Sequence, residues 1–563
     1  MANNTSIAAP WSWQPSTYWD GNDGSWNSFL VQVGTPPQDF RVFPSTAGQE
    51  TWVLNPEGCT SNDPSDCAYL RGVLPFANGT NSSGFDIPSS STWDAIGIYT
   101  LDAQESQLGY QGNGLYGFDS VVLGNDTGAL KQTRQVVATI ADKSYYLGQF
   151  GLGPKSINFT TFNDQIPCYM SDLASSGKIP SLTFGYTAGA AYRNNAPASL
   201  TLGGYDTNRF TPSAVSITMN GDNSRPLQVG LQKILATNVI GGSLNLLPQA
   251  TFHFIDSTVP HIWLPDAAVD AFVSAFGLTY DNNTDLFLIN DTMRSQALQS
   301  NPTITFVFGE SATAGPSDTQ SIELPYAAFD LQASYPFYEN ATNYFPIRRA
   351  ANDTQYTIGR TFFQEAYVIA DWERSNFTVA QARFDSLDSE HLTPILSVAT
   401  EEARNSTSGT TTTTSTTLSG GAIGGIVAGA VVLLVLIGLA IWFCMRKRKQ
   451  RRAPVPTQEP AEDYPNDKKV ALPYEHRGSE LPSENALSEM PSPPVGKHAS
   501  EVDGSPARWG KHGVQEMPSP GIGHEGGLRE LGGGATERLA EAPGSEGLRY
   551  ELPGHEVKRP DAR

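Results

Sequence analysis

Ser45 and Asp256 each begin a loop that directly follows a short apolar segment. The first loop reads Ser45-Thr46-Ala47 and the second reads Asp256-Ser257-Thr258. A carboxylate such as that of Asp256 can take a proton from water, and it acts best beside a group that donates one. The hydroxyl of Ser45 can hold a water molecule but cannot be the base. The two loops therefore offer one proton acceptor and one alcohol.

The histidines suggest no other chemistry. Ser45, His261 and Asp256 have the residue types of a serine triad, but nothing in the pattern would bring them together. His253 and His261 lie eight residues apart, and the eight histidines are scattered without ligand-type neighbours at zinc spacing. We therefore expect neither a metal nor a cofactor, and we interpret His261 as a packed or exposed loop residue.

Short apolar runs separated by Gly, Asn, Asp and Ser extend over residues 29–390 and predict many short strands. The alternation in Phe29 to Gln38, with its Gly-Thr-Pro-Pro turn, predicts a hairpin. Trp52-Val53-Leu54 predicts another strand. Helical patterns are few, and the best are Ala267 to Phe276 and Tyr169 to Gly177. The expected class is all-β.

Five motifs, in order, make the sequence similar to the pepsin-like aspartic proteases. The resemblance covers about residues 29–385 and implies an all-β, bilobal pepsin-like fold with one active-site loop from each lobe. It also implies a cleft between the lobes that takes a peptide or protein ligand. The motifs are Gly34-Thr35-Pro36-Pro37-Gln38, "GQFGLG" from Gly148, "LTLGGYD" from Leu200, Ile255-Asp256-Ser257 with Leu264-Pro265, and "IGRTFF" from Ile358 with Asp371.

The resemblance places a catalytic aspartate at position 45, which lies seven residues after Gln38 and seven before Trp52. That residue is Ser45. Aspartic proteolysis uses two carboxyl groups that share one proton and hold one water. Asp256 remains as the second aspartate, without an acid partner. Asp39 and Glu50 are the nearest carboxylates that could substitute, but neither stands at the required position.

The departures extend to the neighbouring residues. Ala47 and Thr258 stand where the family has glycines that let backbone amides approach the carboxylates, so we expect disturbed packing. Thr46 and Ser257 keep the hydroxyls that cross-link the two loops in the family. Tyr110 is the candidate for the tyrosine of the flap, the hairpin that covers the cleft, although its segment is about three residues short. A packing role is the alternative for Tyr110.

The cysteines predict one small disulfide. Cys59 and Cys67 close a short loop after the first active-site strand, where pepsin-like proteins often carry a bridge. Cys168 is expected to be a buried free thiol. Cys444 lies at the end of an apolar run, where an inert membrane cysteine or a palmitoylation site is expected.

Residues 422–445 are free of charge and would span roughly 36 Å as a helix, enough to cross a bilayer. The basic stretch "RKRKQRR" from Arg446 follows at once and predicts the cytoplasmic side. All twelve Asn-x-Ser/Thr sequons precede this segment, which agrees with an extracellular or lumenal N-terminal part. They are at Asn3, Asn4, Asn78, Asn81, Asn125, Asn158, Asn282, Asn290, Asn340, Asn352, Asn376 and Asn405.

Charge and composition set further limits. The net charge is −21, and residues 446–563 contribute 18 basic and 19 acidic residues, leaving −20 for residues 1–445. So acidic a domain is not expected to bind nucleic acid. The sequence starts with "MANNTSIAAPWSW", without a basic region or an apolar stretch, so we expect a signal peptide missing upstream.

These observations predict six parts of the chain. Their boundaries are an N-terminal segment (1–28), an N-terminal lobe (29–210), a C-terminal lobe (211–390), a Ser/Thr-rich stalk (391–421), a transmembrane helix (422–445) and a disordered cytoplasmic tail (446–563).

The organisation is similar to that of fungal cell-surface proteins of this class. We expect a single-pass glycoprotein of the plasma membrane that contacts lipid and whose tail could dock a cytoplasmic adaptor. Three functions remain open: a pseudoprotease that binds a peptide or acts as a surface module, an active aspartic-type endopeptidase at acid pH, and a structural cell-wall glycoprotein.

Overall fold

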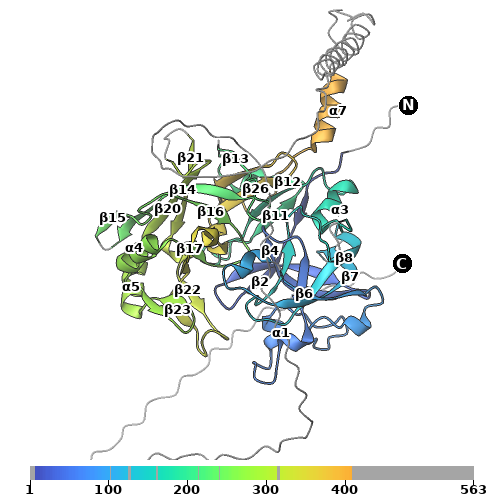
Figure 1. The fold of residues 1–563 in the computed structure, drawn as a ribbon, viewed down its shortest axis with the longest axis horizontal. Helices are drawn as coiled ribbons and strands as arrows, with labels where there is room; N and C mark the ends of the chain where they lie inside the picture. The colour runs from blue at the N-terminus through green and yellow to red at the C-terminus, as the bar shows by residue number, and fades with distance from the viewer. Residues whose placement is uncertain are drawn as a thin grey trace, which may run out of the picture. The chain divides into compact units, whose positions relative to one another are not determined.

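Two β-rich halves pack against each other in the computed structural model (Figure 1). The structure describes residues 7–408, with gaps at 102, 125–127, 160–162, 214, 240 and 314–317. The predicted transmembrane segment, the tail, Cys444, Asn3, Asn4 and Asn125 lie outside these residues. Within the described part, no helix is long and apolar enough to cross a membrane.

The N-terminal half is built on one eight-stranded sheet. Its strands, in spatial order, are β2 (Pro15–Asp20), β3 (Trp26–Val33), β4 (Gln38–Ser45), β9 (Gly148–Gly151), β5 (Thr51–Leu54), β8 (Leu130–Ile140), β7 (Asn113–Leu123) and β6 (Asp94–Thr100). The predicted hairpin is β3 and β4, which pair from Phe29↔Val42 to Val33↔Gln38. Residues 11–28, assigned by sequence to a separate segment, supply β1, β2 and the start of β3.

The C-terminal half has two sheets. The larger has the order β21 (Thr319–Pro325), β20 (Thr303–Gly309), β14 (Gln228–Val239), β16 (Thr251–Ile255), β25 (Thr357–Ile358), β17 (Ile262–Leu264) and β24 (Ile347–Arg349), with β15 (Gly242–Asn245) on β14. The smaller contains β18 (Thr279–Asp281), β19 (Leu286–Leu288), β23 (Thr342–Phe345) and β22 (Leu331–Ala333).

A six-stranded sheet joins the halves because it takes three strands from each. Its order is β1 (Trp11–Trp13), β11 (Ser199–Leu202), β10 (Thr183–Thr187), β26 (Ala366–Asp371), β27 (Asn376–Gln381) and β13 (Ile217–Thr218). The junction is the antiparallel pair β10 and β26, from Thr183↔Asp371 to Tyr186↔Val368. A separate pair, β12 (Gly204–Asp206) and β28 (Leu392–Pro394), lies beside it.

Helices are short and cover the edges of the sheets. The α-helices are α1 (Cys67–Leu70), α2 (Ala103–Ser106), α3 (Tyr169–Ser175), α4 (Asp266–Phe276), α5 (Asp291–Ser300), α6 (Arg360–Phe363) and α7 (Val398–Ser408), and the 3₁₀ turns are Pro56–Gly58, Ile87–Ser89, Thr207–Arg209, Tyr326–Ala328 and Asp353–Gln355. Helix α4 buries Val269 and Phe272 and ends at Gly277, whose φ of +61° suits a left-handed cap. The two helices predicted from sequence are therefore α3 and α4.

Two details concern the ends of the domain and its cysteines. Strand β28 and helix α7 fall within residues that the sequence assigned to the stalk, so the ordered domain continues to Ser408. The predicted Cys59–Cys67 disulfide is confirmed, and Cys168 is a buried free thiol.

Candidate functional site

The same local arrangement carries each candidate loop. Strand β4 runs parallel to β9 and ends at Ser45, which pairs with Gly151. Strand β16 runs parallel to β25, and Asp256 follows its last residue. Both side chains are buried, with 0% and 1% exposure. The two loops therefore meet at equivalent points of the two halves.

Ser45 meets an alcohol across the interface between the loops. Its Oγ lies 2.6 Å from Oγ1 of Thr258, and the two hydroxyls are hydrogen-bonded. The same Oγ accepts a bond from the backbone N–H of Gly48 at 2.7 Å. Oδ1 of Asp256 accepts a bond from the backbone N–H of Thr258 at 2.8 Å. The position expected to hold the first carboxylate is thus occupied by an alcohol with its own partners.

Thr258 explains how the loops pack without the expected glycines. Serine is shorter than aspartate, and its hydroxyl is within hydrogen-bond distance of the hydroxyl of Thr258. The sequence predicts that Ala47 and Thr258 disturb this region. The structure instead shows a closed contact in which Thr258 is 9% exposed and bonded to Ser45. The two departures from the family pattern are therefore in direct contact.

The loop hydroxyls cross-link the halves reciprocally. The backbone N–H of Thr46 donates to Oγ of Ser257 at 3.1 Å, and the N–H of Ser257 donates to Oγ1 of Thr46 at 3.0 Å. Oγ of Ser257 also donates to the carbonyl of Pro44 at 2.7 Å. These bonds fix the relative position of the loops, whatever chemistry the site performs.

Arg360 is a functional-site residue that the sequence analysis missed. It is 4% exposed, and its Nε and Nη2 donate to the carbonyls of Ser257 at 3.0 Å and Thr258 at 2.7 Å. Its guanidinium lies 4.2 Å from the ring centre of Phe43 and 5.3 Å from that of Trp26. A buried cation therefore binds the backbone of the second loop. The sequence signalled Arg360 only by its place in the "IGRTFF" motif.

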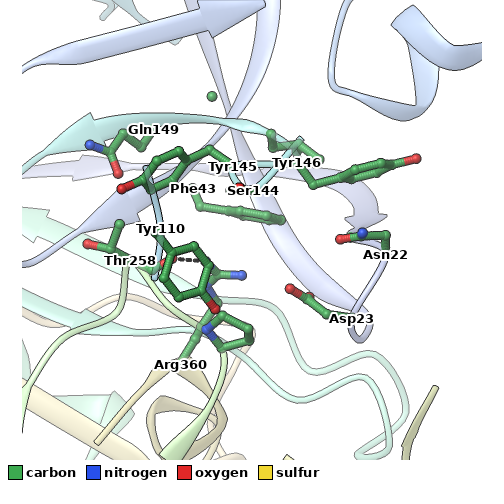
Figure 2. Close-up of a pocket in the computed structure, with 14 residues that line it drawn as sticks. Asn22, Asp23, Phe43, Tyr110, Ser144, Tyr145, Tyr146, Gln149, Thr258 and Arg360 are labelled. Carbon is green, nitrogen blue, oxygen red and sulfur yellow. Dashed lines mark hydrogen bonds between the residues drawn. The ribbon is translucent and has the colours of Figure 1, made fainter. Parts of the chain in front are cut away.

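Asp23 contributes the opposite charge in the same region. Its Oδ1 accepts a bond from Nε1 of Trp26 at 2.7 Å. Burial raises the pKa of Asp23, and the positive charge of Arg360 opposes that rise. Figure 2 shows Asp23 and Arg360 on the same side of the pocket, below Phe43. The loop that carries Asp23 lies in the predicted N-terminal segment, which gave no signal for a site.

Gln149 is a polar residue of strand β9 whose side chain is buried. It is 4% exposed, and neither atom of its amide has a hydrogen-bond partner among the described residues. Together with Tyr110, Thr258 and Arg360 it lines a small pocket (Figure 2). The pocket encloses about 30 Å³, room for roughly two water molecules. No peptide fits in that volume.

Tyr110 forms one wall of the pocket. We call residues 103–110 the flap segment; it lies in the N-terminal half and reaches the other half. The Tyr110 hydroxyl lies 3.2 Å from Nδ1 of His261, and its ring is 5.8 Å from that of Tyr145. Burial raises the pKa of Tyr110. Leu108 packs against Val259 of the second loop. The flap candidate therefore spans the two halves.

The other side of the cleft is also filled. Trp26 and Leu147 of the N-terminal half form one apolar cluster with Leu286, Leu331 and Tyr344 of the C-terminal half. The Tyr344 hydroxyl donates to the carbonyl of Asp23 at 2.5 Å, and the backbone N–H of Ser334 donates to the carbonyl of Asn22 at 2.8 Å. The halves contact each other on both sides of the loops.

The remaining candidates do not form a catalytic group. His261 is bonded to Tyr110, whereas the hydroxyl of Ser45 faces Thr258, so the contacts do not run through a triad. Asp39 accepts a bond from Gln32, and Glu50 accepts bonds from Trp52 and Tyr116. Among the described residues there is no cluster of side chains that could hold a metal ion.

The described sequons are at the surface. Asn376 is half-buried, and the other acceptor asparagines are exposed; these are Asn78, Asn81, Asn158, Asn282, Asn290, Asn340, Asn352 and Asn405.

Comparisons with known proteins identify the family of this chain. The family model of eukaryotic aspartyl proteases matches residues 29–382. The probable aspartic-type endopeptidase OPSB of Arthroderma benhamiae is 25% identical over 384 residues, which cover 66% of this chain and 71% of the relative. Pepsin B of Canis lupus familiaris is 23% identical, with 61% and 77% covered. Aspartic proteinase 3 of Saccharomyces cerevisiae is 22% identical, with 67% and 73% covered.

Among solved structures, the aspartic proteinase from Irpex lacteus is similar, with a TM-score of 0.45 and 17% identity over 67% of this chain and 99% of that chain. Two all-β halves, each presenting one loop to the other, define the pepsin-like class. The chain belongs to the eukaryotic aspartyl protease family.

Proposed function

We propose that this protein is a membrane-anchored, extracellular pepsin-like protein that does not hydrolyse peptides and serves as a binding module at the cell surface. The observation that carries the proposal is the 2.6 Å contact between the hydroxyls of Ser45 and Thr258. An acid–base pair of carboxyls needs like charges close together so that one proton is shared between them. An alcohol at position 45 removes that coupling and leaves Asp256 without a second carboxyl to act with.

The closed cleft determines how a ligand would bind. A peptide between the halves has to displace the flap segment, since Tyr110 and Leu108 occupy the approach to the second loop. This displacement breaks the contact with His261 and exposes apolar surface. Binding is therefore coupled to opening, and the open state costs free energy that the ligand must supply.

The proposed membrane anchor is inferred from the sequence of residues 422–452. An uncharged segment followed by a basic cluster supports a single span with the tail in the cytosol. In this arrangement the basic cluster contacts anionic lipid, and the tail is available to a cytoplasmic adaptor. Protease added to intact cells should spare the tail, whereas glycosidase should reduce the mass of the N-terminal part. An externally cleaved tail would contradict this topology.

An acid endopeptidase is the second candidate. Asp256 is retained at the meeting point of the loops, and the cross-link through Thr46 and Ser257 is intact. The relatives described above carry the names of proteases. These features would support catalysis if another group replaced the missing carboxyl.

A proteolysis assay separates the two candidates. The ectodomain (residues 1–408) is incubated with a denatured protein substrate from pH 3 to 6, beside its Asp256→Ala variant. We expect no cleavage by either protein, because loss of an essential group lowers the rate by several orders of magnitude. Cleavage that disappears in Asp256→Ala would establish the endopeptidase. A Ser45→Asp, Ala47→Gly, Thr258→Gly variant tests whether the scaffold can regain activity.

A further inference from the structure

A groove of about 650 Å³ is lined by residues of the six-stranded sheet and by none of the residues of the two loops. Its floor is formed by Ile369 and Asp371 of β26 and by Asn376 and Thr378 of β27. These residues pair directly across the strands, Asp371 with Asn376 and Ile369 with Thr378. The volume is within the range of about 300–1,000 Å³ that ligand sites occupy.

The chemistry of the walls suits a neutral carbohydrate. Tyr205 and Phe210 contribute aromatic rings, 5.7 Å apart and edge to face, against which the apolar face of a sugar can pack. Arg374 binds Asp371 at 2.9 Å and Glu401 at 2.6 Å. One guanidinium between two carboxylates leaves no excess positive charge for a phosphate. The carboxylates keep lone pairs that can accept bonds from sugar hydroxyls.

The groove contains its own attachment point. Asn376-Phe377-Thr378 is a sequon within β27, and Asn376 and Thr378 both line the groove because residues two apart share one face of a strand. Phe377 points the other way and is fully buried. Asn376 is also the half-buried acceptor among otherwise exposed ones. A glycan attached here would begin inside the groove.

We propose that an N-linked glycan on Asn376 occupies this groove and becomes part of the folded domain. Attachment forms a bond from Nδ2 of Asn376 to C1 of the first sugar, with a lipid diphosphate as leaving group and one amide proton released. The inference rests on the extracellular topology of the proposed function, since a cytosolic domain would not meet the glycosylation machinery.

The seated glycan connects the sheet to the segment that leaves the domain. Leu396 and Glu401 line the groove, and Glu401 belongs to α7, the last described element before the stalk (Figure 1). Arg374 already joins both to the sheet, because its Nη2 donates to the Leu396 carbonyl at 3.0 Å and to Glu401. Sugars packed between these walls would hold α7 in a fixed direction relative to the sheet.

The test measures occupancy and protection site by site. The full chain is expressed in a eukaryotic secretory host, and peptide N-glycosidase is applied in ¹⁸O-water to the native and to the denatured protein. Mass spectrometry then follows conversion of each asparagine to labelled aspartate. Asn340, which is exposed and in the same half, is the matched control. We expect native release at Asn376 to be at least tenfold slower than at Asn340, and equal release after denaturation.

Variants of the groove test whether its walls cause the protection. Tyr205→Ala should accelerate native release at Asn376 and leave Asn340 unchanged. If Tyr205→Ala does not fold, Glu401→Gln removes one polar contact from the rim without disturbing the core. Asn376→Gln should increase hydrogen exchange in residues 394–401, whereas Asn340→Gln should not.

Three other outcomes of the glycosidase experiment would each refute a different part of the proposal. Occupied Asn340 with empty Asn376 refutes the glycan site and leaves the proposed function standing. Occupancy of both with equal native release refutes the seating in the groove. No occupancy at any described sequon refutes the extracellular topology and the glycan together.

Discussion

The hydroxyl oxygens of Ser45 and Thr258 lie 2.6 Å apart although the residues are 213 positions apart in the chain. Each residue departs from the family pattern, and each departure suits the other. A short alcohol stands at position 45, and a branched alcohol at position 258 is hydrogen-bonded to it. The site is thus a packed junction whose polar groups are bonded across the two halves.

Removing the hydroxyl of Thr258 tests this junction. Thr258→Val keeps the shape and deletes the bond to Ser45, so we expect the free energy of unfolding to fall by about 1 kcal/mol. Urea unfolding of residues 1–408 measures the change. The exposed Thr211→Val is the control and should alter stability little. An unchanged free energy of unfolding in Thr258→Val would show that the bond between Ser45 and Thr258 contributes nothing to stability.

Substitution of Arg360 should lower the stability of the domain more than substitution at most other positions. Arg360→Met leaves two buried carbonyls without these donors and removes a positive charge near Asp23. We expect a loss of about 3–5 kcal/mol, as for other broken buried charge networks. Thermal unfolding is the measurement, with the half-exposed Arg383→Met as control. A loss equal to that of the control would contradict the role given to Arg360.

The flap segment should open more easily without its contact to His261. Tyr110→Phe leaves Nδ1 of His261 unpaired in a buried site, which costs about 1–3 kcal/mol. Amide exchange near residue 110 should therefore accelerate about tenfold or more, which mass spectrometry detects. The exposed Tyr280→Phe is the control. Exchange that is unaltered in Tyr110→Phe would mean that the segment is held by packing alone.

The burial of His253 should make the stability of the domain depend on pH. It is fully buried and stacks on Tyr356 at 5.2 Å, and burial lowers its pKa to about 3. The unfolded chain binds a proton near pH 6.5 whereas the folded chain does not, so stability is lost as pH falls below about 6.5. From pH 6.5 to 5 this one group should cost about 2 kcal/mol, at 1.36 kcal/mol per pH unit.

The contribution of His253 is measured by comparing how steeply the unfolding free energy changes with pH in the wild type and in variants. Buried carboxyls with raised pKa, such as Asp20 and Glu365, act in the opposite direction, and comparing variants cancels them. The unfolding free energy of His253→Asn should depend less steeply on pH than that of the wild type. The exposed His391→Asn should keep the wild-type slope. Parallel curves for all three proteins would rule out His253 as a source of the pH dependence.

The sequence predicted the parts of the fold that depend on local pattern. The hairpin of β3 and β4 and the helices α3 and α4 follow from alternation and periodicity, whereas the Cys59–Cys67 bridge was implied by the resemblance to the pepsin-like family. Position 45 of the first loop followed from counting from Gln38 and Trp52 with the family spacing, and the second loop followed from the motif around Asp256. These features are determined within about twenty residues of chain or by a motif of fixed length.

The contacts between distant segments could not be predicted in the same way. The bond between Ser45 and Thr258 and the support from Arg360 depend on which side chains face each other across the two halves. Thr258 gave a signal only as a departure from a family pattern, and Gln149 gave none. Tyr110 was identified, but its partner His261 was interpreted as an ordinary loop residue.

The pairing of β10 with β26 makes the halves interdependent. Strand β10 of the N-terminal half pairs with strand β26 of the C-terminal half. In a fragment ending near residue 210, β10 would therefore be an edge strand without this partner, and Phe184 and Tyr186, which are buried in the whole domain, would be uncovered. Such a fragment would associate with other chains rather than remain monomeric. The two-lobed domain should accordingly unfold in a single cooperative transition, with no half-folded species along the way.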